Sequence, residues 1–171
     1  YIESSDQALS KHRITLKSVF DMYAELHQES AGVHQWQRRK LVSCGEWIDL
    51  VDHLGILASG NLSLVEAKLI FAWSRIRSVA DYSEHAQARL RNLQFEDFLE
   101  AIVRLSLMMA LPTDFEIAAV GAQDAGEYLM ELRGNKSEMS DFVESRKRAW
   151  YMEPNQTVGR CIDHLVSIIT R

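Results

Sequence analysis

Three capping boxes mark the starts of helices in this chain and constrain its fold more than any other feature. In each box a Ser or Thr precedes a Glu by three residues, so the two side chains can satisfy backbone N–H groups in the first turn of a helix. The boxes lie at Ser43–Glu46, Ser63–Glu66 and Thr113–Glu116. Apolar residues at helical spacing follow each box. Only 2 Pro and 8 Gly interrupt the 171 residues, so the pattern predicts an all-α fold.

Apolar periodicity extends this prediction along the chain. We expect helices at residues 15–29, 43–55, 63–79, 95–109, 113–132, 137–150 and 157–170. The first can begin earlier, near residue 5, and the sixth can begin at residue 140 instead of 137. Two short segments have extended character, Leu41-Val42 and Leu93-Gln94. No longer strand is expected.

The segment LQFEDFLEAI, which begins at Leu93, resembles the exiting helix of an EF-hand. In that resemblance Leu93 is loop position 8, Asp97 is loop position 12, and Phe98 is the aromatic residue that follows. A calcium loop needs oxygen ligands at positions 1, 3, 5 and 12 and a glycine at position 6. Positions 1, 3, 5 and 6 here hold Ala86, Ala88, Leu90 and Arg91. The loop is therefore expected not to bind calcium.

An earlier segment is a weaker match to the same pattern. If Trp47 takes the place of Phe98, then Glu46 is loop position 12 and Val42 is position 8. Positions 1, 3, 5 and 6 are then Gln35, Gln37, Arg39 and Lys40. Cations in the loop repel a calcium ion, so this loop is also expected to be empty of metal. In an EF-hand pair, the segments around Val42 and Leu93 would lie side by side as a minimal antiparallel bridge.

Taken together, residues 1–111 resemble a degenerate EF-hand pair, similar to modules of the p25-alpha family of tubulin-associated proteins and of ciliary and flagellar proteins. The resemblance implies an EF-hand-like pair of helix-loop-helix units. Residues 112–171 match no family that we can name, and we expect them to form a C-terminal three-helix extension. The extension should pack on the pair as one structural unit, because each helix has an apolar face that it cannot bury alone.

For function, the resemblance implies a calcium-independent protein–protein interaction module, a scaffold or adaptor within a larger cytoskeletal, ciliary or flagellar protein of the cytoplasm. The alternative is a calcium-binding EF-hand regulatory protein with non-standard loops. The expected partner is a protein or peptide helix, with tubulin or another cytoskeletal protein as a candidate.

EF-hand pairs accept a partner helix in an apolar groove between their own helices. The residues expected to form this groove are Trp47, Leu54, Phe71, Trp73, Phe98, Met108 and Met109. The other interpretation of these residues is a core position, which we expect for Phe71 and Phe98. A third possibility is that the helix at 157–170 fills the groove within the same chain. The basic cluster Arg38, Arg39 and Lys40 is a candidate docking patch for acidic tails, although such clusters are commonly solvated.

Other classes of function find little support in the sequence. It contains no P-loop, G-x-S-x-G or G-x-G-x-x-G motif, so we expect no enzyme, catalytic residue or cofactor. The 6 His are dispersed, so we expect no metal site. Cys44 near a helix start is a candidate reactive thiol, but a small apolar residue in a capped turn is the commoner role. The net charge of -5 argues against general nucleic-acid binding, and the apolar run at 105–111 is shorter than the ~20 residues of a membrane span.

Overall fold

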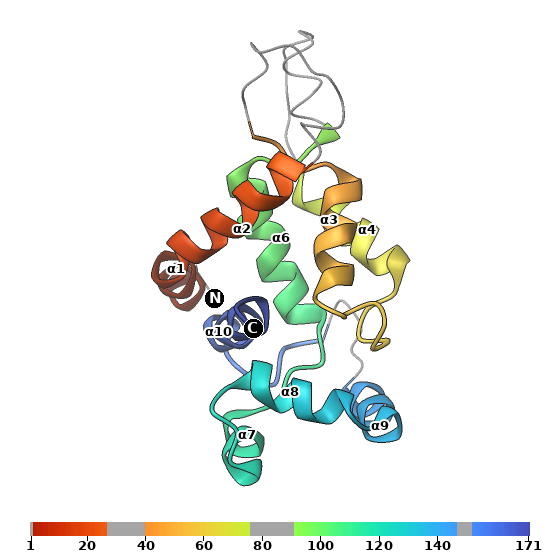
Figure 1. Ribbon diagram of the computed structural model, residues 1–171. Coiled ribbons are helices and arrows are strands. Elements are labelled where there is room, and N and C mark those ends of the chain that lie inside the picture. The colour runs from red at the N-terminus through yellow and green to blue at the C-terminus, as the bar shows by residue number, and fades with distance from the viewer. Residues whose placement is uncertain (1, 27–39, 76–90, 147–151) are drawn as a thin grey trace, which may run out of the picture.

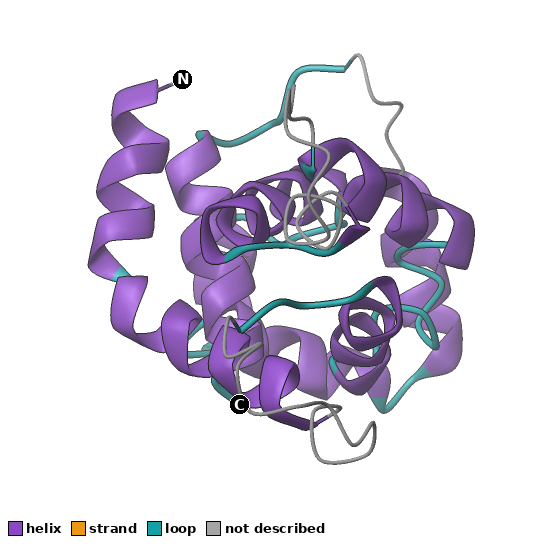
Figure 2. Cartoon of the chain, turned by 90° about the horizontal axis from the view of Figure 1, so that it is seen from above, coloured by secondary structure: helices purple, strands orange, loops and turns teal. Residues whose placement is uncertain are grey.

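The computed structural model describes residues 2–26, 40–75, 91–146 and 152–171, and within these ranges the fold is all-α (Figure 1). The nine helices in the described ranges are α1 (Ile2–Lys11), α2 (Arg13–Leu26), α3 (Cys44–His53), α4 (Leu64–Ser74), α6 (Phe95–Met108), α7 (Asp114–Val120), α8 (Ala125–Arg133), α9 (Lys136–Arg146) and α10 (Val158–Ile169). Figure 2 shows these helices joined by loops, with no strand drawn among the described residues.

All three predicted capping boxes are confirmed. Ser43, Ser63 and Thr113 are the N-cap residues of α3, α4 and α7. In each case the N-cap hydroxyl accepts the backbone N–H of the Glu three residues later, and that carboxylate accepts the N-cap backbone N–H. These bonds satisfy donors that a helix start would otherwise leave without partners, so the local sequence alone specifies where these helices begin.

The single helix predicted at 113–132 is wrong, because the structure divides this segment into α7 and α8. Gly121 ends α7 with a φ of 77°, a left-handed conformation that glycine adopts without strain. Asp124 then starts α8 as an N-cap whose carboxylate accepts the Glu127 N–H at 2.9 Å. Residues 112–171 therefore hold four described helices, and the expected three-helix extension is corrected to that number.

The start of the chain is helical from Ile2, and the helices α1 and α2 meet at His12. The predicted helix at 15–29 corresponds to α2. The predicted ends at 27–29, 76–79 and 147–150 lie outside the described residues.

The short antiparallel bridge predicted near Val42 and Leu93 is confirmed. Val42 donates its N–H to the Leu93 carbonyl at 3.0 Å, and Leu93 donates to the Val42 carbonyl at 2.8 Å. The bridge holds the starts of α3 and α6 together. Just beyond it, the rings of Trp47 and Phe98 meet edge to face with centroids 6.2 Å apart, which extends the contact into the core.

α10 lies at the centre of the molecule, in contact with α1, α6 and α8 (Figure 1). Its apolar stripe is buried, with Ile162 and Leu165 fully enclosed. Two glycines permit the close approach of its neighbours. A Cβ at Gly159 would lie 2.6 Å from the Ser4 carbonyl oxygen of α1, and a Cβ at Gly126 would lie 2.6 Å from the backbone oxygen of Ser167. The last helix is thus a central element of the core.

Candidate protein-interaction site

Four of the seven residues expected in a partner groove are buried in the core: Trp47, Phe71, Phe98 and Met109. For Phe71 and Phe98 this is the core position expected from the sequence. For Trp47 and Met109, burial means that the side chains offer no surface to a partner in this conformation, and their assignment as groove walls stays a prediction. The indole N–H of Trp47 donates to the Ala67 carbonyl at 2.9 Å, so this residue ties α3 to α4. Leu54 and Met108 are partly buried and pack against the same core.

The seventh residue, Trp73, belongs to an exposed apolar face of α4. Val65, Leu69 and Trp73 follow one another at intervals of four residues, and helical geometry places them on one side. Val65 is 66% exposed and Trp73 is 41% exposed. Lys68 and Ala72 lie on the same side and are exposed. We refer to these five residues as the α4 outer face.

The opposite side of α4 is buried through Ala67, Ile70, Phe71 and Ser74. The helix is therefore apolar on both sides, although only one side contacts the core. Surface helices of globular proteins normally present charged residues outward, and an exposed apolar patch indicates an interaction surface. The sequence contained this signal, because the spacing of Val65, Leu69 and Trp73 forms a second apolar stripe beside that of Ile70 and Phe71.

The two acidic residues at the expected loop position 12 are engaged in local bonds. Glu46 and Asp97 are both buried. The Glu46 carboxylate accepts the N–H of Ser43, and the Asp97 carboxylate accepts the N–H of Gln94 at 3.1 Å. Each carboxylate therefore closes the first turn of its own helix, α3 or α6. Among the residues that the structure describes, no group of three His, Cys, Asp or Glu side chains could hold a metal ion.

Only one residue of the basic cluster can be located, because Arg38 and Arg39 lie outside the described residues. The Lys40 ammonium lies 3.3 Å from the Asp21 carboxylate on α2. Lys17 binds the same carboxylate at 2.5 Å. The hydrogen bond from Lys17, assisted by Lys40, holds the pKa of Asp21 below its usual value. Lys40 is thus part of a local charge cluster on the surface of α2.

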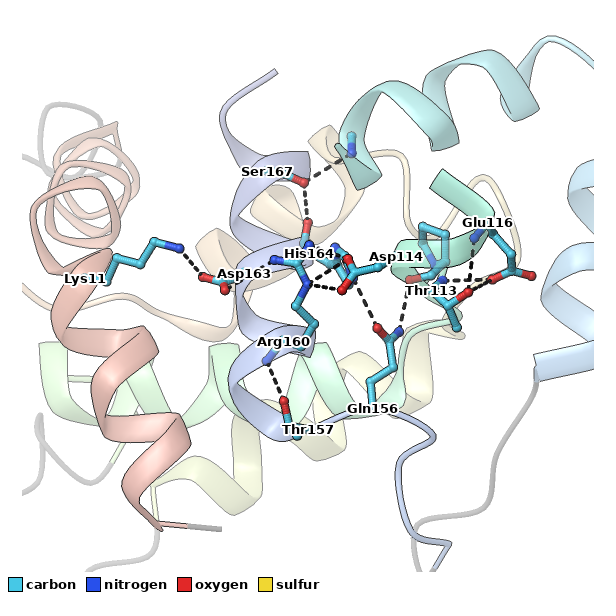
Figure 3. Close-up of polar contacts among 12 residues, drawn as sticks. Lys11, Thr113, Asp114, Glu116, Gln156, Thr157, Arg160, Asp163, His164 and Ser167 are labelled. Carbon is cyan, nitrogen blue, oxygen red and sulfur yellow. Dashed lines mark hydrogen bonds and ion pairs between the residues drawn. The ribbon is translucent and has the colours of Figure 1, made fainter. Parts of the chain in front are cut away.

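A polar network surrounds α10 and joins elements far apart in the sequence (Figure 3). On one side, Asp163 accepts from Lys11 at 2.9 Å and lies 2.6 Å from His12 Nε2, which links α10 to the end of α1. On the other side, the Arg160 guanidinium binds Asp114 of α7, with its Nε at 2.8 and 3.0 Å from the two carboxylate oxygens. Arg160 holds the pKa of Asp114 below its usual value, chiefly through these hydrogen bonds.

His164 is the buried centre of this network, with only 2% of its side chain exposed. Its Nε2 lies 3.2 Å from Gln156 Oε1 and 3.6 Å from Asp114 Oδ1. Burial, followed by the nearby charge of Arg160, lowers the pKa of His164, so the ring is neutral at pH 7. The Ser167 hydroxyl donates to the backbone carbonyl of His164 at 2.7 Å and accepts the Gly126 N–H at 3.2 Å.

These contacts give the network a structural role. The Ser167 hydroxyl donates to the backbone carbonyl of His164 and not to its ring, so these two side chains do not form a pair of hydroxyl nucleophile and imidazole base. The network holds α1, α7 and α8 to α10. No local sequence pattern indicates this network, because Lys11 and Asp163 are 152 residues apart. Cys44, the candidate thiol, is the first residue of α3 and is partly buried, and its reactivity stays a prediction.

Among the described residues, no helix combines the length and the hydropathy that a membrane span requires. Comparisons with protein-family models, with curated proteins and with solved structures found no match to this chain. The resemblance to EF-hand pairs stays a prediction from the residues that carry it.

Proposed function

We propose that this chain is a calcium-independent protein–protein interaction module, built on a degenerate EF-hand pair, that acts as a scaffold or adaptor. The observation that carries the proposal is the α4 outer face, an exposed apolar surface on a helix whose other side is already buried. A partner helix with apolar residues at matching spacing would cover this face.

The energetics favour such a contact. Full burial of one large aliphatic side chain is worth about 1.5–3 kcal/mol, and tryptophan is among the residues that dominate binding energy at interfaces. On the α4 outer face, Val65 is an aliphatic side chain of this kind and Trp73 is the tryptophan, with Leu69 between them. Lys68 is the one formal charge of the α4 outer face, so an acidic residue at the edge of the partner helix would complement it.

Two observations support the EF-hand part of the proposal. The Val42–Leu93 bridge joins the two residues that the resemblance assigns to loop position 8. The carboxylates assigned to position 12, Glu46 and Asp97, accept backbone N–H groups at the starts of their helices. Helix starts stabilised in this way need no bound cation to hold them, which favours calcium independence over the calcium-binding alternative.

A photo-crosslinking experiment with the full chain tests the interaction surface. A benzophenone amino acid replaces Val65 in one protein, and in the matched control it replaces Phe115, an 82% exposed residue of α7. In cells we expect a discrete cross-linked product from position 65 that a calcium chelator does not remove. Equal products from the two positions would contradict the assigned surface, and loss of the product on chelation would favour the calcium-dependent alternative.

Calorimetry and tryptophan fluorescence test calcium directly. We expect no heat of binding and no change in emission at millimolar calcium. Saturable binding in the micromolar range would overturn the calcium-independent proposal.

A cytoskeletal setting in the cytoplasm, including a cilium or flagellum, is the part of the proposal that rests on the resemblance alone. Co-sedimentation with microtubules tests it, with Arg38 and Arg39 replaced by Glu in a second protein. The proposal expects the wild-type chain to pellet with microtubules and the double variant to stay in solution. Absence of wild-type binding would remove tubulin as the partner. The cross-linking experiment would then be the test of the interaction module.

A further inference from the structure

A pocket of about 360 Å³ opens between the end of α3 and the two helices α8 and α10. Leu54 lines it from the α3 side, Leu129 and Met130 from α8, and Ile168 from α10. Leu54 is also one of the residues expected in a partner groove. Because Ile168 belongs to α10, the pocket lies beside the central helix, which also packs against α6 and α8.

The inner wall of the pocket is formed by buried apolar side chains. Leu129 is only 1% exposed, and Ile168 is also buried, so both belong to the packed core. Met130 stands at the mouth and is largely exposed. An alkyl chain placed here would contact packed aliphatic side chains on the inside and an adaptable methionine side chain on the outside.

Two arginines line the same pocket but differ in their charge environment. The Arg171 guanidinium binds Asp124 at 2.9 Å and lies 3.8 Å from Glu127, so acidic neighbours balance its charge. Arg133 has no carboxylate within ion-pair distance in the part of the chain that the structure describes. One of its terminal nitrogens donates to the Leu54 carbonyl at 2.6 Å. A guanidinium carries five N–H donors, so most of its hydrogen-bonding capacity remains available.

We propose that this pocket binds a small amphipathic anion of the medium-chain carboxylate class. The alkyl chain lies along Leu129 and Ile168, and the carboxylate meets the guanidinium of Arg133. The charge at the mouth selects an anion over a cation, and the planar guanidinium fits a carboxylate in particular. The volume is near the lower limit of small-molecule pockets, so it suits a single short chain and is too small for a partner helix.

The contact between Arg133 and Leu54 is compatible with this role. Leu54 is the C-cap residue of α3, and a cation at a helix C-terminus is favourable by itself. The Leu54 carbonyl also holds the guanidinium in place at the mouth before any ligand arrives. Pre-positioning of this kind reduces the entropy lost on binding.

Calorimetric titration of the full chain with decanoate, below its micelle concentration, tests the proposal. Decyltrimethylammonium has the same chain with the opposite charge, and acetyl-Gly-Leu with a free C-terminus represents a peptide carboxylate. We expect saturable one-site binding of decanoate, no binding of the ammonium compound, and weaker binding of the peptide. Equal binding of the ammonium compound, tighter binding of the peptide, or no saturable binding of decanoate would each overturn the proposal.

Variants locate the site. Arg133→Gln should weaken the affinity for decanoate about tenfold or more, because the loss of a hydrogen bond between charged groups lowers an affinity by that factor. Arg133→Lys should fall between this variant and the wild type, and Met130→Glu should abolish binding by placing a carboxylate at the mouth. Lys136→Gln removes an exposed cation of α9 outside the pocket and should bind as the wild type does. Circular dichroism of each variant checks the fold, and unchanged affinity in a folded Arg133→Gln protein would refute the assignment.

Discussion

Replacing Gly159 with alanine tests the packing of α10 directly against α1. The added Cβ would lie 2.6 Å from the carbonyl oxygen of Ser4, which is about 0.8 Å closer than the shortest ordinary van der Waals contact of 3.4 Å. The atom in the way belongs to the backbone of α1, so no side-chain rotation can relieve the clash. The two helices must move apart, and the buried stripe of α10 loses part of its packing.

The size of the effect follows from two opposing contributions. Overpacking a close contact costs about 1–3 kcal/mol, and a clash with the backbone belongs in the upper part of that range. Alanine in a helix regains about 1 kcal/mol relative to glycine. We therefore expect Gly159→Ala to lower the free energy of unfolding by about 2 kcal/mol. For a chain of this length that loss corresponds to a fall in Tm of about 4–8 °C.

A matched control is available in Gly45→Ala. Gly45 is also helical, but it is exposed, and a Cβ there would meet only the Ser43 hydroxyl at 3.8 Å. This variant should be as stable as the wild type or up to about 1 kcal/mol more stable. Gly126→Ala repeats the test at the contact between α8 and α10, where the clash distance is also 2.6 Å. Thermal and urea unfolding followed by circular dichroism give the comparison. If Gly159→Ala and Gly45→Ala are equally stable, α10 does not lie against α1 at this residue.

Three further predictions concern single contacts. Asn61→Ala should lower the free energy of unfolding in urea by about 1–3 kcal/mol. The reason is that the Asn61 amide accepts the Ala110 N–H at 2.7 Å and donates to the Ala110 carbonyl at 3.3 Å. A change below about 0.5 kcal/mol would contradict the contribution of these two bonds. Trp47→Phe should lower the free energy of unfolding by about 1–3 kcal/mol, because it removes the buried hydrogen bond of the indole N–H and leaves a void beside it. A variant as stable as the wild type would argue against that hydrogen bond. The pKa of His164 lies below its usual value near 6.5, so on acidification the unfolded chain takes up a proton there before the folded chain does. Stability should therefore fall as the pH drops below about 6.5 toward the lowered pKa. Urea unfolding between pH 8 and pH 5 measures this slope, His164→Gln should flatten it, and a gain in stability on acidification would refute the sign.

Much of the helix placement could be predicted because its signals are local. Capping boxes act over three residues, so Ser43, Ser63 and Thr113 mark helix starts whatever the rest of the chain does. The division of the 113–132 segment also has local signals. Gly121 is a helix-ending residue, and Asp124 is a strong N-cap. Apolar residues at helical spacing continue across both of them, so periodicity alone predicts one uninterrupted helix.

The candidate interaction site was predicted less well, because apolar character does not say which side of a helix meets the core. Phe71 and Trp73 are two residues apart on α4 and equally suited to burial, yet the core covers Phe71 and leaves much of Trp73 exposed. Trp47 could be a groove wall or a core residue from its sequence alone. Its position became clear only from the carbonyl of Ala67 and the ring of Phe98 that meet it in the folded chain.

By itself, the sequence determined the all-α class, the capped helix starts and the amphipathic last helix, since each depends on residues close together or on a repeated spacing. The pairing of Val42 with Leu93 joins distant parts of the chain, and only the resemblance to an EF-hand pair predicted it. Only the tertiary structure decided that α10 lies at the centre and that α4 keeps an apolar face outward. It also decided that His164 is buried within a network that reaches from α1 to α7. The physical reason is that burial and polar pairing are properties of surfaces brought together from distant parts of the chain, and helical periodicity gives each helix its faces without giving it its neighbours.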